Sequence, residues 1–306
     1  MATKASSITR RFATGLAAAV FAFFFAVGSL AADDPRPVVD ASKLPVEKIE
    51  NSRLPTLHIV GDSTVRGGGS GNGIVGWGER IKPFFDTNKI NVVNDAIAGR
   101  SARSYFAEGR WDRVSRLLKP GDVVIIQFGH NDQGRIGDPA NKHRADGGGI
   151  GPEIAYDTMT NGTRVAVHTF GWYMTYFVTD AEKRGATVII CSPIPHKQKW
   201  EAMRDFADIA AWDAEVAKDQ GASFIDLTMV ITDAYRKMGM EKVQELFADK
   251  GTHTTDAGAQ LNASCVIAGL KGLQPDPLAA FFSEKAKAIQ PWAPGNDVTN
   301  VSDVLR

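Results

Sequence analysis

The sequence predicts a three-layer α/β/α domain with a mostly parallel five-stranded sheet in the order 2-1-3-4-5. Two observations support this fold class. Apolar runs of strand length alternate with segments whose apolar residues have helical spacing. The runs are rich in valine and isoleucine, which is typical of strands in a parallel sheet covered on both faces. The 2-1-3-4-5 order is a common arrangement for sheets of this kind.

The alternation begins near residue 54 and defines the expected elements in turn. The expected strands are TLHIV (56–60), INVVNDA (90–96), DVVIIQF (122–128), ATVIICS (186–192) and SFIDL (223–227). The stretches with helical spacing cover about 101–118, 168–184, 200–219 and 256–271. In a sheet of this type ligands bind outside the carboxyl ends of the strands, so functional residues are expected there.

Length and composition are those of a globular enzyme with one large domain, which is expected at 54–275. The chain has 306 residues, of which 43% are hydrophobic and 23% are charged. Its 35 basic residues balance 35 acidic ones, so no overall field favours nucleic acid or an anionic membrane as a partner. Residues 33–53 are expected to form an irregular leader, and residues 276–306 a C-terminal extension.

Residues 1–32 have the pattern of a secretory signal peptide. Basic residues precede the apolar run LAAAVFAFFFAVGSLAA, which ends on small residues before DDPRP. Cleavage is expected near Ser29-Leu30-Ala31 or one residue later. The alternative is a membrane anchor, but a span requires about 18 or more unbroken apolar residues and small residues dilute this run. We therefore expect a secreted or periplasmic protein with no membrane contact after cleavage.

Three predicted strand ends carry the groups that acyl transfer requires. Ser63 follows the first strand, Gly99 the second and Asn131 the third. In the 2-1-3 order the first strand lies between the other two, and neighbouring strands are about 4.8 Å apart, so these residues converge. Ser63 offers a hydroxyl nucleophile. The backbone N–H groups of Ser63 and Gly99 and the side-chain amide of Asn131 offer donors for an oxyanion hole.

A base for Ser63 is expected among the six histidines of the chain. His58 lies within a predicted strand and is expected to pack in the sheet, whereas His143 lies in a glycine-rich insertion and is expected to be solvated. His253 precedes the last long helix, and Asp249 stands just before it. An aspartate paired with a histidine fixes the tautomer and stabilises the imidazolium. His253 with Asp249 is therefore the preferred base.

Four blocks of the sequence resemble the SGNH (GDSL-type) hydrolase superfamily, in that superfamily's order: GDST, the glycine of AGRS, GHND and the histidine of THTTDAGA. The resemblance implies a flavodoxin-like SGNH hydrolase fold. It also implies Ser63 as nucleophile, Gly99 and Asn131 as oxyanion donors beside the Ser63 N–H, and His253 as base. The G-x-S-x-G motif of the other large Ser-His-Asp esterase fold is absent.

The supporting aspartate departs from the family pattern. That pattern places it three residues before the histidine, where this chain has Lys250, whereas Asp249 stands four before. Gly251 is expected to absorb the extra residue in a bulge-like loop by adopting a positive φ. The rival partner is Asp256, three residues after His253, but its position is typical of a helix entry. We therefore prefer Asp249.

Longer strings resemble the rhamnogalacturonan acetylesterases within this superfamily. They include GWGERI, EGRWDRV, PGDVVIIQFGHND and HTFGWYM, and the likeness runs from about residue 54 to 272. It implies an exported serine carbohydrate esterase that removes O-acetyl groups from acetylated rhamnogalacturonan, the substrate being a polysaccharide or an oligosaccharide. The alternatives are an esterase for another acetylated glycan or a small ester, and a carbohydrate-binding protein that kept the fold but lost catalysis.

Several features around the predicted site have both a structural and a functional interpretation. Tryptophans near the strand ends stack on sugars in some proteins but are more often core residues. These are Trp77, Trp111, Trp172 and Trp200. The glycines of 67–73 are expected to form a loop at the rim of the site. The insertion 141–163 is too long for a simple connection, and loops of this size are commonly functional or disordered.

Cysteine usage indicates neither a metal site nor a disulfide framework. Cys191 and Cys265 permit one disulfide, but we expect buried free thiols. No CxxC, HExxH or clustered His/Cys pattern is present. The predicted chemistry requires no cofactor and no metal.

Overall fold

The computed structural model describes residue 44 and residues 47–68, 73–201 and 204–293. The described residues all belong to one compact unit. The predicted signal peptide 1–32 and most of the leader 33–53 lie outside the described residues, as do the glycine-rich residues 69–72. No helix in the described part of the chain combines the length and the apolar character needed to cross a membrane.

The central sheet has five parallel strands. They are β1 (Thr56–Gly61), β2 (Asn91–Asn94), β3 (Val123–Gln127), β6 (Thr187–Cys191) and β7 (Ser223–Ile225). Their order across the sheet is β2-β1-β3-β6-β7, with every neighbouring pair parallel. The predicted 2-1-3-4-5 order is confirmed, and each predicted strand overlaps an observed one. The sheet therefore brings the ends of β2, β1 and β3 side by side.

Alternation along the strands buries both faces of the sheet. In β1, Leu57 and Ile59 belong to one hydrophobic cluster and Val60 to the other. In β3, Ile125 belongs to the first cluster and Val124 to the second. Because successive side chains point to opposite faces, apolar residues at every position are needed to cover the sheet on both sides.

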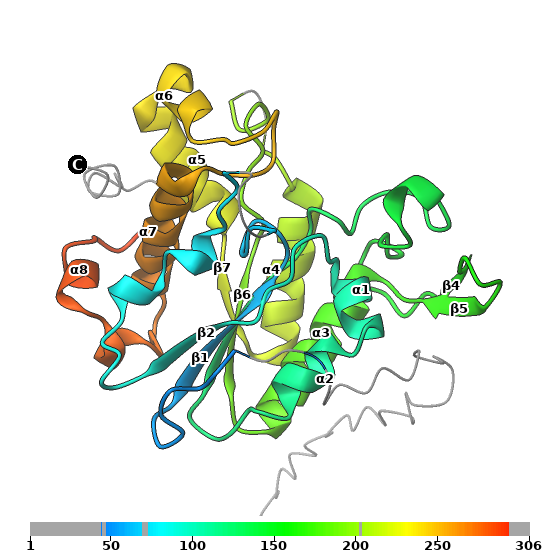
Figure 1. The fold of residues 1–306 in the computed structure, drawn as a ribbon, viewed down its shortest axis with the longest axis horizontal. Coiled ribbons are helices and arrows are strands. Elements are labelled where there is room, and N and C mark those ends of the chain that lie inside the picture. Colours follow the sequence, from blue (N-terminus) through cyan, green and yellow to red (C-terminus); the bar gives the residue numbers. More distant parts are fainter. Residues whose placement is uncertain (1–43, 45–46, 69–72, 202–203, 294–306) are drawn as a thin grey trace, which may run out of the picture. The chain divides into compact units, whose positions relative to one another are not determined.

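Helices cover the two faces in two groups (Figure 1). The first cluster packs α5 (Leu227–Met238) and α7 (Asp256–Gly272) on one face. The second packs α1 (Ala102–Ala107), α2 (Arg110–Ser115), α3 (Phe170–Lys183) and α4 (Ala207–Gln220) on the other. The three-layer α/β/α architecture is confirmed.

The structure differs from the predicted elements at several points. The helix expected at 101–118 is two helices, because Gly109 between them has a φ of 68°. Helix α5 begins inside the strand expected at 223–227, where the Asp226 side chain accepts from the N–H of Met229 and caps the helix. The hairpin β4 (Ala155–Thr158) and β5 (Arg164–Val167) and helix α6 (Met240–Glu245) were not expected.

The described part of the C-terminal extension packs against the core. It contains η5 (Ala279–Phe281) and α8 (Glu284–Lys287), two short helices. Leu278, Phe282 and Ile289 belong to the cluster formed by α5 and α7. Phe282 also forms an isolated antiparallel bridge with Phe85, just after η3 (Lys82–Phe84).

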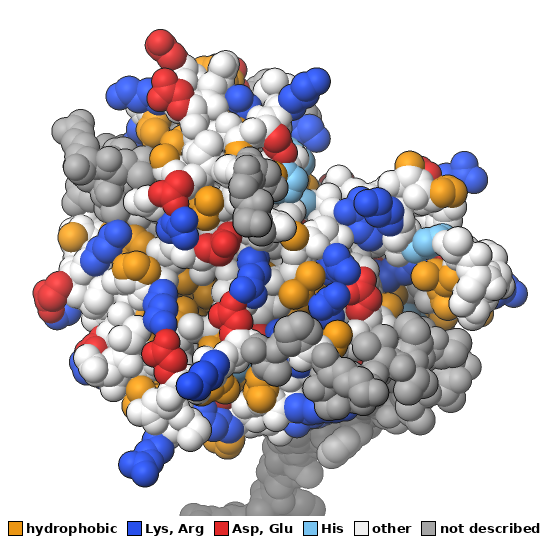
Figure 2. All heavy atoms as spheres, in the orientation of Figure 1, with side chains coloured by type: hydrophobic (Ala, Val, Ile, Leu, Met, Phe, Trp, Pro, Cys, Tyr) orange, Lys and Arg blue, Asp and Glu red, His pale blue; other side chains and the backbone are white. Residues whose placement is uncertain are grey.

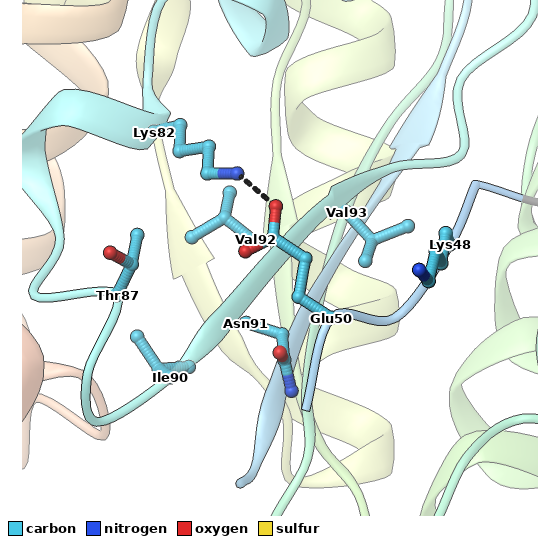
Figure 3. Close-up of a pocket in the computed structure, with 8 residues that line it drawn as sticks. All are labelled: Lys48, Glu50, Lys82, Thr87, Ile90, Asn91, Val92 and Val93. Atoms are coloured by element: carbon cyan, nitrogen blue, oxygen red, sulfur yellow. Dashed lines mark hydrogen bonds and ion pairs between the residues drawn. The ribbon is translucent and has the colours of Figure 1, made fainter. Parts of the chain in front are cut away.

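Strand β2 lies at one edge of the sheet, and the end of the leader covers it. The N–H of Asn51 donates to the Asn91 side chain at 3.0 Å, and the Asn91 amide donates back to the Asn51 carbonyl at 2.8 Å. Glu50 accepts from Lys82 at 2.8 Å across a pocket of about 10 Å³ (Figure 3). That volume suffices for one water molecule, so the pocket is too small to be a ligand site. The contacts cover a strand edge that would otherwise be exposed.

The structure tests the expectations for tryptophan and cysteine. Trp77, Trp111 and Trp200 are buried in the core as expected, with the indole of Trp77 donating to the Gln127 side chain at 2.8 Å. Trp172 is only partly buried and packs against the second cluster. Both cysteines are buried free thiols, which confirms that prediction.

Candidate active site

Ser63 stands in a tight turn at the carboxyl end of β1. The Asp62 carboxylate accepts the backbone N–H and the hydroxyl of Thr64 through Oδ1, at 2.8 and 2.7 Å. Gln127, at the end of β3, donates to the Thr64 hydroxyl at 2.7 Å. A Cβ at Gly61 would lie 2.7 Å from the Gln127 carbonyl oxygen, so the strand end requires glycine. Buried groups of this turn and of β3 therefore hold the residues on both sides of Ser63, which is itself only 8% exposed.

His253 stands in the loop ahead of α7, and one carboxylate organises this loop. Asp249 Oδ1 accepts the backbone N–H groups of Gly251, Thr252 and His253 at 2.9, 2.8 and 3.1 Å. The short side chain thus turns the backbone without a left-handed residue. Gly251 does not adopt the positive φ expected of it. The extra residue before His253 is accommodated by these hydrogen bonds, which corrects the glycine-bulge explanation.

The His253 loop is tied to the segment that follows the glycine-rich stretch. The N–H of Val75 donates to the Thr254 carbonyl at 2.9 Å, and the Thr254 hydroxyl donates to the Val75 carbonyl at 2.7 Å. The N–H of Lys197 donates to the Gly251 carbonyl at 2.8 Å. Contacts on both sides therefore hold the His253 loop in place.

Ser63, His253 and Asp249 form one hydrogen-bonded chain. His253 Nδ1 lies 2.5 Å from Asp249 Oδ2, and His253 Nε2 lies 2.8 Å from Ser63 Oγ. The carboxylate holds the proton on Nδ1 and leaves Nε2 to accept from the serine hydroxyl. Partial burial raises the pKa of Asp249, but hydrogen bonds from the Gly251 N–H and from His253 outweigh it and bring the pKa below its ordinary value. Asp249 is therefore ionised at neutral pH.

Asp256, the rival partner, points elsewhere. It is the first residue of α7, where the Thr255 side chain caps the helix by accepting from the Gly258 N–H. Its carboxylate pairs with Arg80 at 2.5 Å and accepts from Gln260 at 2.6 Å. The helix entry expected for Asp256 is what the structure shows.

Ser63, Gly99 and Asn131 each have an N–H hydrogen without an acceptor among the described residues. The backbone N–H groups of Ser63 and Gly99 have no acceptor among the described residues. The Asn131 amide donates one hydrogen to the Arg100 carbonyl at 3.1 Å, and its second hydrogen has no acceptor in the same part of the chain. Gly99 has a φ of 74°, which favours glycine there. Ser63, Gly99 and Asn131 line the same pocket, so their free N–H groups are candidate donors to an oxyanion.

These groups line an open pocket of about 360 Å³, which is within the usual range for ligand sites. Its described lining consists of Ser63, Gly68, Ile74, Ala98, Gly99, Arg100, Asn131, Lys142, Arg144 and His253. Gly68 is the one described glycine of 67–73 in this lining, and residues 69–72 of the expected rim loop lie outside the described residues. No acidic side chain is among the described lining residues.

Sequence reasoning missed two cations in the pocket wall, Lys142 and Arg144. Both belong to the insertion 141–163, for which only the length indicated a functional or disordered loop. The structure orders this insertion: Arg103 pairs with Asp157 at 2.8 Å and donates to the Ala145 carbonyl at 2.7 Å. The one available signal was the basic run KHR within the insertion.

A buried carboxyl pair lies beneath the donors and was also missed. Asp132 accepts the N–H groups of Ala102 and Gly129 at 2.6 and 2.8 Å, which links the loops after β2 and β3. Burial, with the nearby charge of Asp146, raises the pKa of Asp132 well above its ordinary value. Burial likewise raises the pKa of Asp146 to about 7.

The remaining histidines have other partners. His58 is fully buried in the sheet, as predicted, with Nδ1 2.8 Å from Asp95. The expectation that His143 is solvated is wrong, because its side chain is 16% exposed and Nδ1 lies 3.0 Å from buried Asp157 of the hairpin. Within 47–68, 73–201 and 204–293, no group of three or more histidine, cysteine or acidic side chains is placed to hold a metal ion.

Comparison with known proteins identifies the class. Residues 59–261 match the GDSL-like Lipase/Acylhydrolase family, and the chain belongs to it. It is a serine esterase. The fold agrees with a crystal structure of the Bacillus subtilis protein YxiM, at a TM-score of 0.57 and 23% identity, covering 71% of this chain and 56% of that one.

Two curated relatives are similar over most of their length. A rhamnogalacturonan acetylesterase of Emericella nidulans is 30% identical over 221 residues, which cover 69% of this chain and 83% of the relative. A probable rhamnogalacturonan acetylesterase of Bacillus subtilis, YesY, is 27% identical over 224 residues, which cover 71% of this chain and 93% of the relative.

Proposed function

We propose that this protein is an exported carbohydrate esterase that removes O-acetyl groups from acetylated rhamnogalacturonan, with Ser63, His253 and Asp249 as its catalytic triad. The observation that carries the chemistry is the continuous hydrogen-bonded chain from Asp249 Oδ2 through His253 to Ser63 Oγ. Two relatives named as rhamnogalacturonan acetylesterases support the substrate.

The reaction proceeds in two steps on this geometry. His253 Nε2 takes the proton of the Ser63 hydroxyl while Oγ attacks the acetyl carbonyl carbon, and the carbonyl oxygen becomes an oxyanion held by the donors at Ser63, Gly99 and Asn131. When this tetrahedral intermediate collapses, the bond between the acetyl carbon and the sugar oxygen breaks. The sugar oxygen takes the proton from His253 and leaves as a hydroxyl. Water then attacks the acetyl-serine with His253 as base, so that acetate leaves and Ser63 regains its proton.

The charge of the pocket supports an acidic polysaccharide. Arg100, Lys142 and Arg144 line it together with Ser63, and none of its described lining residues is acidic. Arg100 is paired with Glu108 at 3.0 Å, whereas neither Lys142 nor Arg144 has an ion-pair partner among the described residues. Elsewhere, on the face shown in Figure 2, basic and acidic side chains are interspersed. A local excess of positive charge in a cleft raises the local concentration of an anionic substrate.

Acetate release from a panel of acetylated substrates tests the proposal. Acetylated rhamnogalacturonan is expected to be hydrolysed with a higher kcat/KM than acetylated xylan or mannan. Equal rates across the panel would remove the rhamnogalacturonan assignment and leave the esterase. No release from any acetyl ester would remove the esterase proposal itself.

Removing one pocket cation sharpens the substrate test. Lys142→Gln is expected to raise KM severalfold on acetylated rhamnogalacturonan at low salt, and to leave hydrolysis of a neutral acetyl ester unchanged. Lys218→Gln, on the exposed side of α4 and outside the pocket lining, is the matched control. An equal effect of Lys142→Gln on both substrates would contradict the electrostatic role.

Export is a separate part of the proposal and rests on the residue pattern of 1–32. When the full chain is expressed with a functional secretion pathway, the protein recovered outside the cytoplasm is expected to begin just after Ala31 or Ala32. N-terminal sequencing of that protein measures the cleavage point. Retention of the intact N-terminus in the membrane fraction would favour the anchor instead.

A further inference from the structure

We propose that Arg144 is a positioning residue of the oxyanion hole: its guanidinium holds the Asn131 amide in the one orientation that presents an N–H to the substrate. The inference rests on the proposed esterase function and deepens it. It assigns a task to a residue that lies outside the four sequence blocks and belongs to the insertion 141–163.

Arg144 fixes the orientation of the Asn131 side-chain amide. A side-chain amide has two orientations of nearly equal shape, with nitrogen and oxygen exchanged. Arg144 Nη1 donates to Asn131 Oδ1 at 2.7 Å, and Asn131 Nδ2 donates to the Arg100 carbonyl at 3.1 Å. A guanidinium has no acceptor, so the flipped amide would set its NH2 against Arg144 and its oxygen against a carbonyl oxygen. The observed orientation leaves the second Nδ2 hydrogen for the pocket.

Backbone carbonyls hold the Arg144 guanidinium in place. Arg144 Nε donates to the Asn141 carbonyl at 2.9 Å, and Nη1 also lies 3.4 Å from the Gly99 carbonyl. One side chain therefore contacts both loops that carry oxyanion donors outside the nucleophile turn. The next residues of the insertion anchor it to the core, because the N–H of Asp146 donates to the Asp132 carbonyl at 3.1 Å.

The positive charge of Arg144 also acts on the Asn131 amide. The three hydrogen-bond acceptors of Arg144 are two backbone carbonyls and one amide oxygen, and no carboxylate neutralises it among the described residues. A guanidinium carries a positive charge and offers only hydrogen-bond donors. A full positive charge on the oxygen side of the amide polarises the N–H groups of Asn131 and strengthens the bond they make to a developing oxyanion.

This role makes a specific prediction for a double-mutant cycle. Loss of one oxyanion donor costs about a hundredfold to a thousandfold in kcat. Arg144→Met removes the guanidinium but leaves the amide, so kcat for a neutral aryl acetate is expected to fall about tenfold to a hundredfold with KM within about twofold. In an Asn131→Ala background the same substitution is expected to change kcat by less than about twofold, because no amide remains to be positioned.

The experiment measures steady-state kinetics of the four proteins, with thermal unfolding as a check on folding. Losses that multiply in the double variant would overturn the inference, as would a loss seen only as a higher KM on an acidic substrate, which would make Arg144 a carboxylate-binding residue. Inactivity of the wild-type protein on every acetyl ester would instead refute the proposed function. The two failures are therefore distinguishable.

Two further variants keep the test decisive if Arg144→Met folds poorly. Arg144→Lys keeps a charged donor and is expected to retain more kcat than Arg144→Gln, whose amide can donate but carries no charge. Equal kcat losses in these two variants would overturn the role of the charge. Arg135→Met is the matched control, because Arg135 is an exposed arginine shortly before the insertion 141–163 and outside the pocket lining. The kcat of this variant is expected to equal that of the wild type.

Discussion

The two sides of the active-site pocket hold their carboxyl groups in opposite ways. On the base side, Asp249 is 37% exposed, and its hydrogen bonds lower its pKa despite the opposing effect of partial burial. On the oxyanion side, Asp132 and Asp146 are buried, and burial raises the pKa of both. Three backbone N–H groups and an imidazole stabilise the ionised form of Asp249, whereas burial disfavours the ionised form of Asp132 and of Asp146.

The base side and the oxyanion side therefore contribute differently to catalysis and to stability. The base side must provide a charge, so its aspartate stays ionised close to solvent. The oxyanion side must provide fixed dipoles. There, buried Asp132 is the acceptor that joins the loops after β2 and β3, and buried Asp146 accepts from the Gly148 N–H. Substitutions on the base side should therefore affect chemistry most. Substitutions beneath the oxyanion side should affect stability and its dependence on pH.

The largest effect is expected at the junction of the two sides. Ser63→Ala should reduce kcat by roughly four to six orders of magnitude, because the hydroxyl that forms the acyl-enzyme is lost. His253→Ala should do the same, and the double variant should be little worse than either single one, since the residues act as a unit. Acetate release with enough protein to detect residual turnover measures all three. Near wild-type release by Ser63→Ala would refute its role as nucleophile.

The next effect separates Asp249 from Asp256. Asp249→Asn should lower kcat by about three to four orders of magnitude, because an amide favours the wrong histidine tautomer and weakens the loop. Asp256→Asn removes one end of a surface ion pair with Arg80 and should cost about 1 kcal/mol of unfolding free energy or less, with kcat unchanged. Kinetics and chemical denaturation of both variants decide between them. The reverse pattern would move the triad aspartate to Asp256.

On the oxyanion side, Asn131→Ala should lower kcat by about two to three orders of magnitude and change KM little, because its donor acts mainly in the transition state. This loss should be smaller than that of Asp249→Asn. Steady-state kinetics on one neutral acetyl ester give both parameters. A loss confined to KM would make Asn131 a residue that positions the substrate.

The smallest expected effect is on stability and concerns Asp146. Its pKa of about 7 in the folded protein lies above the unfolded value of about 3.9, so the folded state binds its proton more tightly. This group therefore lowers the stability of the wild type as pH rises from about 4 to 7, and the loss persists above that range. Asp146→Asn keeps an oxygen for the Gly148 N–H and removes the charge. It should raise the unfolding temperature at pH 8 more than at pH 5.

A matched variant controls for the general effect of removing a negative charge. Asp219→Asn, on the exposed surface near the end of α4, should leave the pH dependence of the unfolding temperature as in the wild type. If Asp146→Asn also leaves it unchanged, Asp146 does not carry the raised pKa. The contrast between the two sides of the pocket would then rest on Asp132 alone.

The sheet and the convergence of Ser63, Gly99 and Asn131 could be predicted from the amino-acid sequence alone. Runs such as DVVIIQF indicate a strand that is buried on both faces of the sheet, because a parallel strand covered by helices must be apolar at nearly every position. The polar residues after three such runs then meet at one edge, as the strand order requires. Elements without such a pattern were missed, among them the hairpin β4–β5 and the short helix α6.

The way in which the loops complete the site could not be predicted and became clear from the folded structure. The spacing of Asp249 and His253 did not reveal that one carboxylate oxygen accepts three consecutive N–H groups, so a glycine bulge was wrongly expected. Nor did the insertion 141–163 reveal that Arg144 reaches the Asn131 amide. The physical reason is the same in both cases. Periodicity reports which faces an element buries, whereas the path of a loop depends on individual hydrogen bonds between groups that the chain brings together only when it folds.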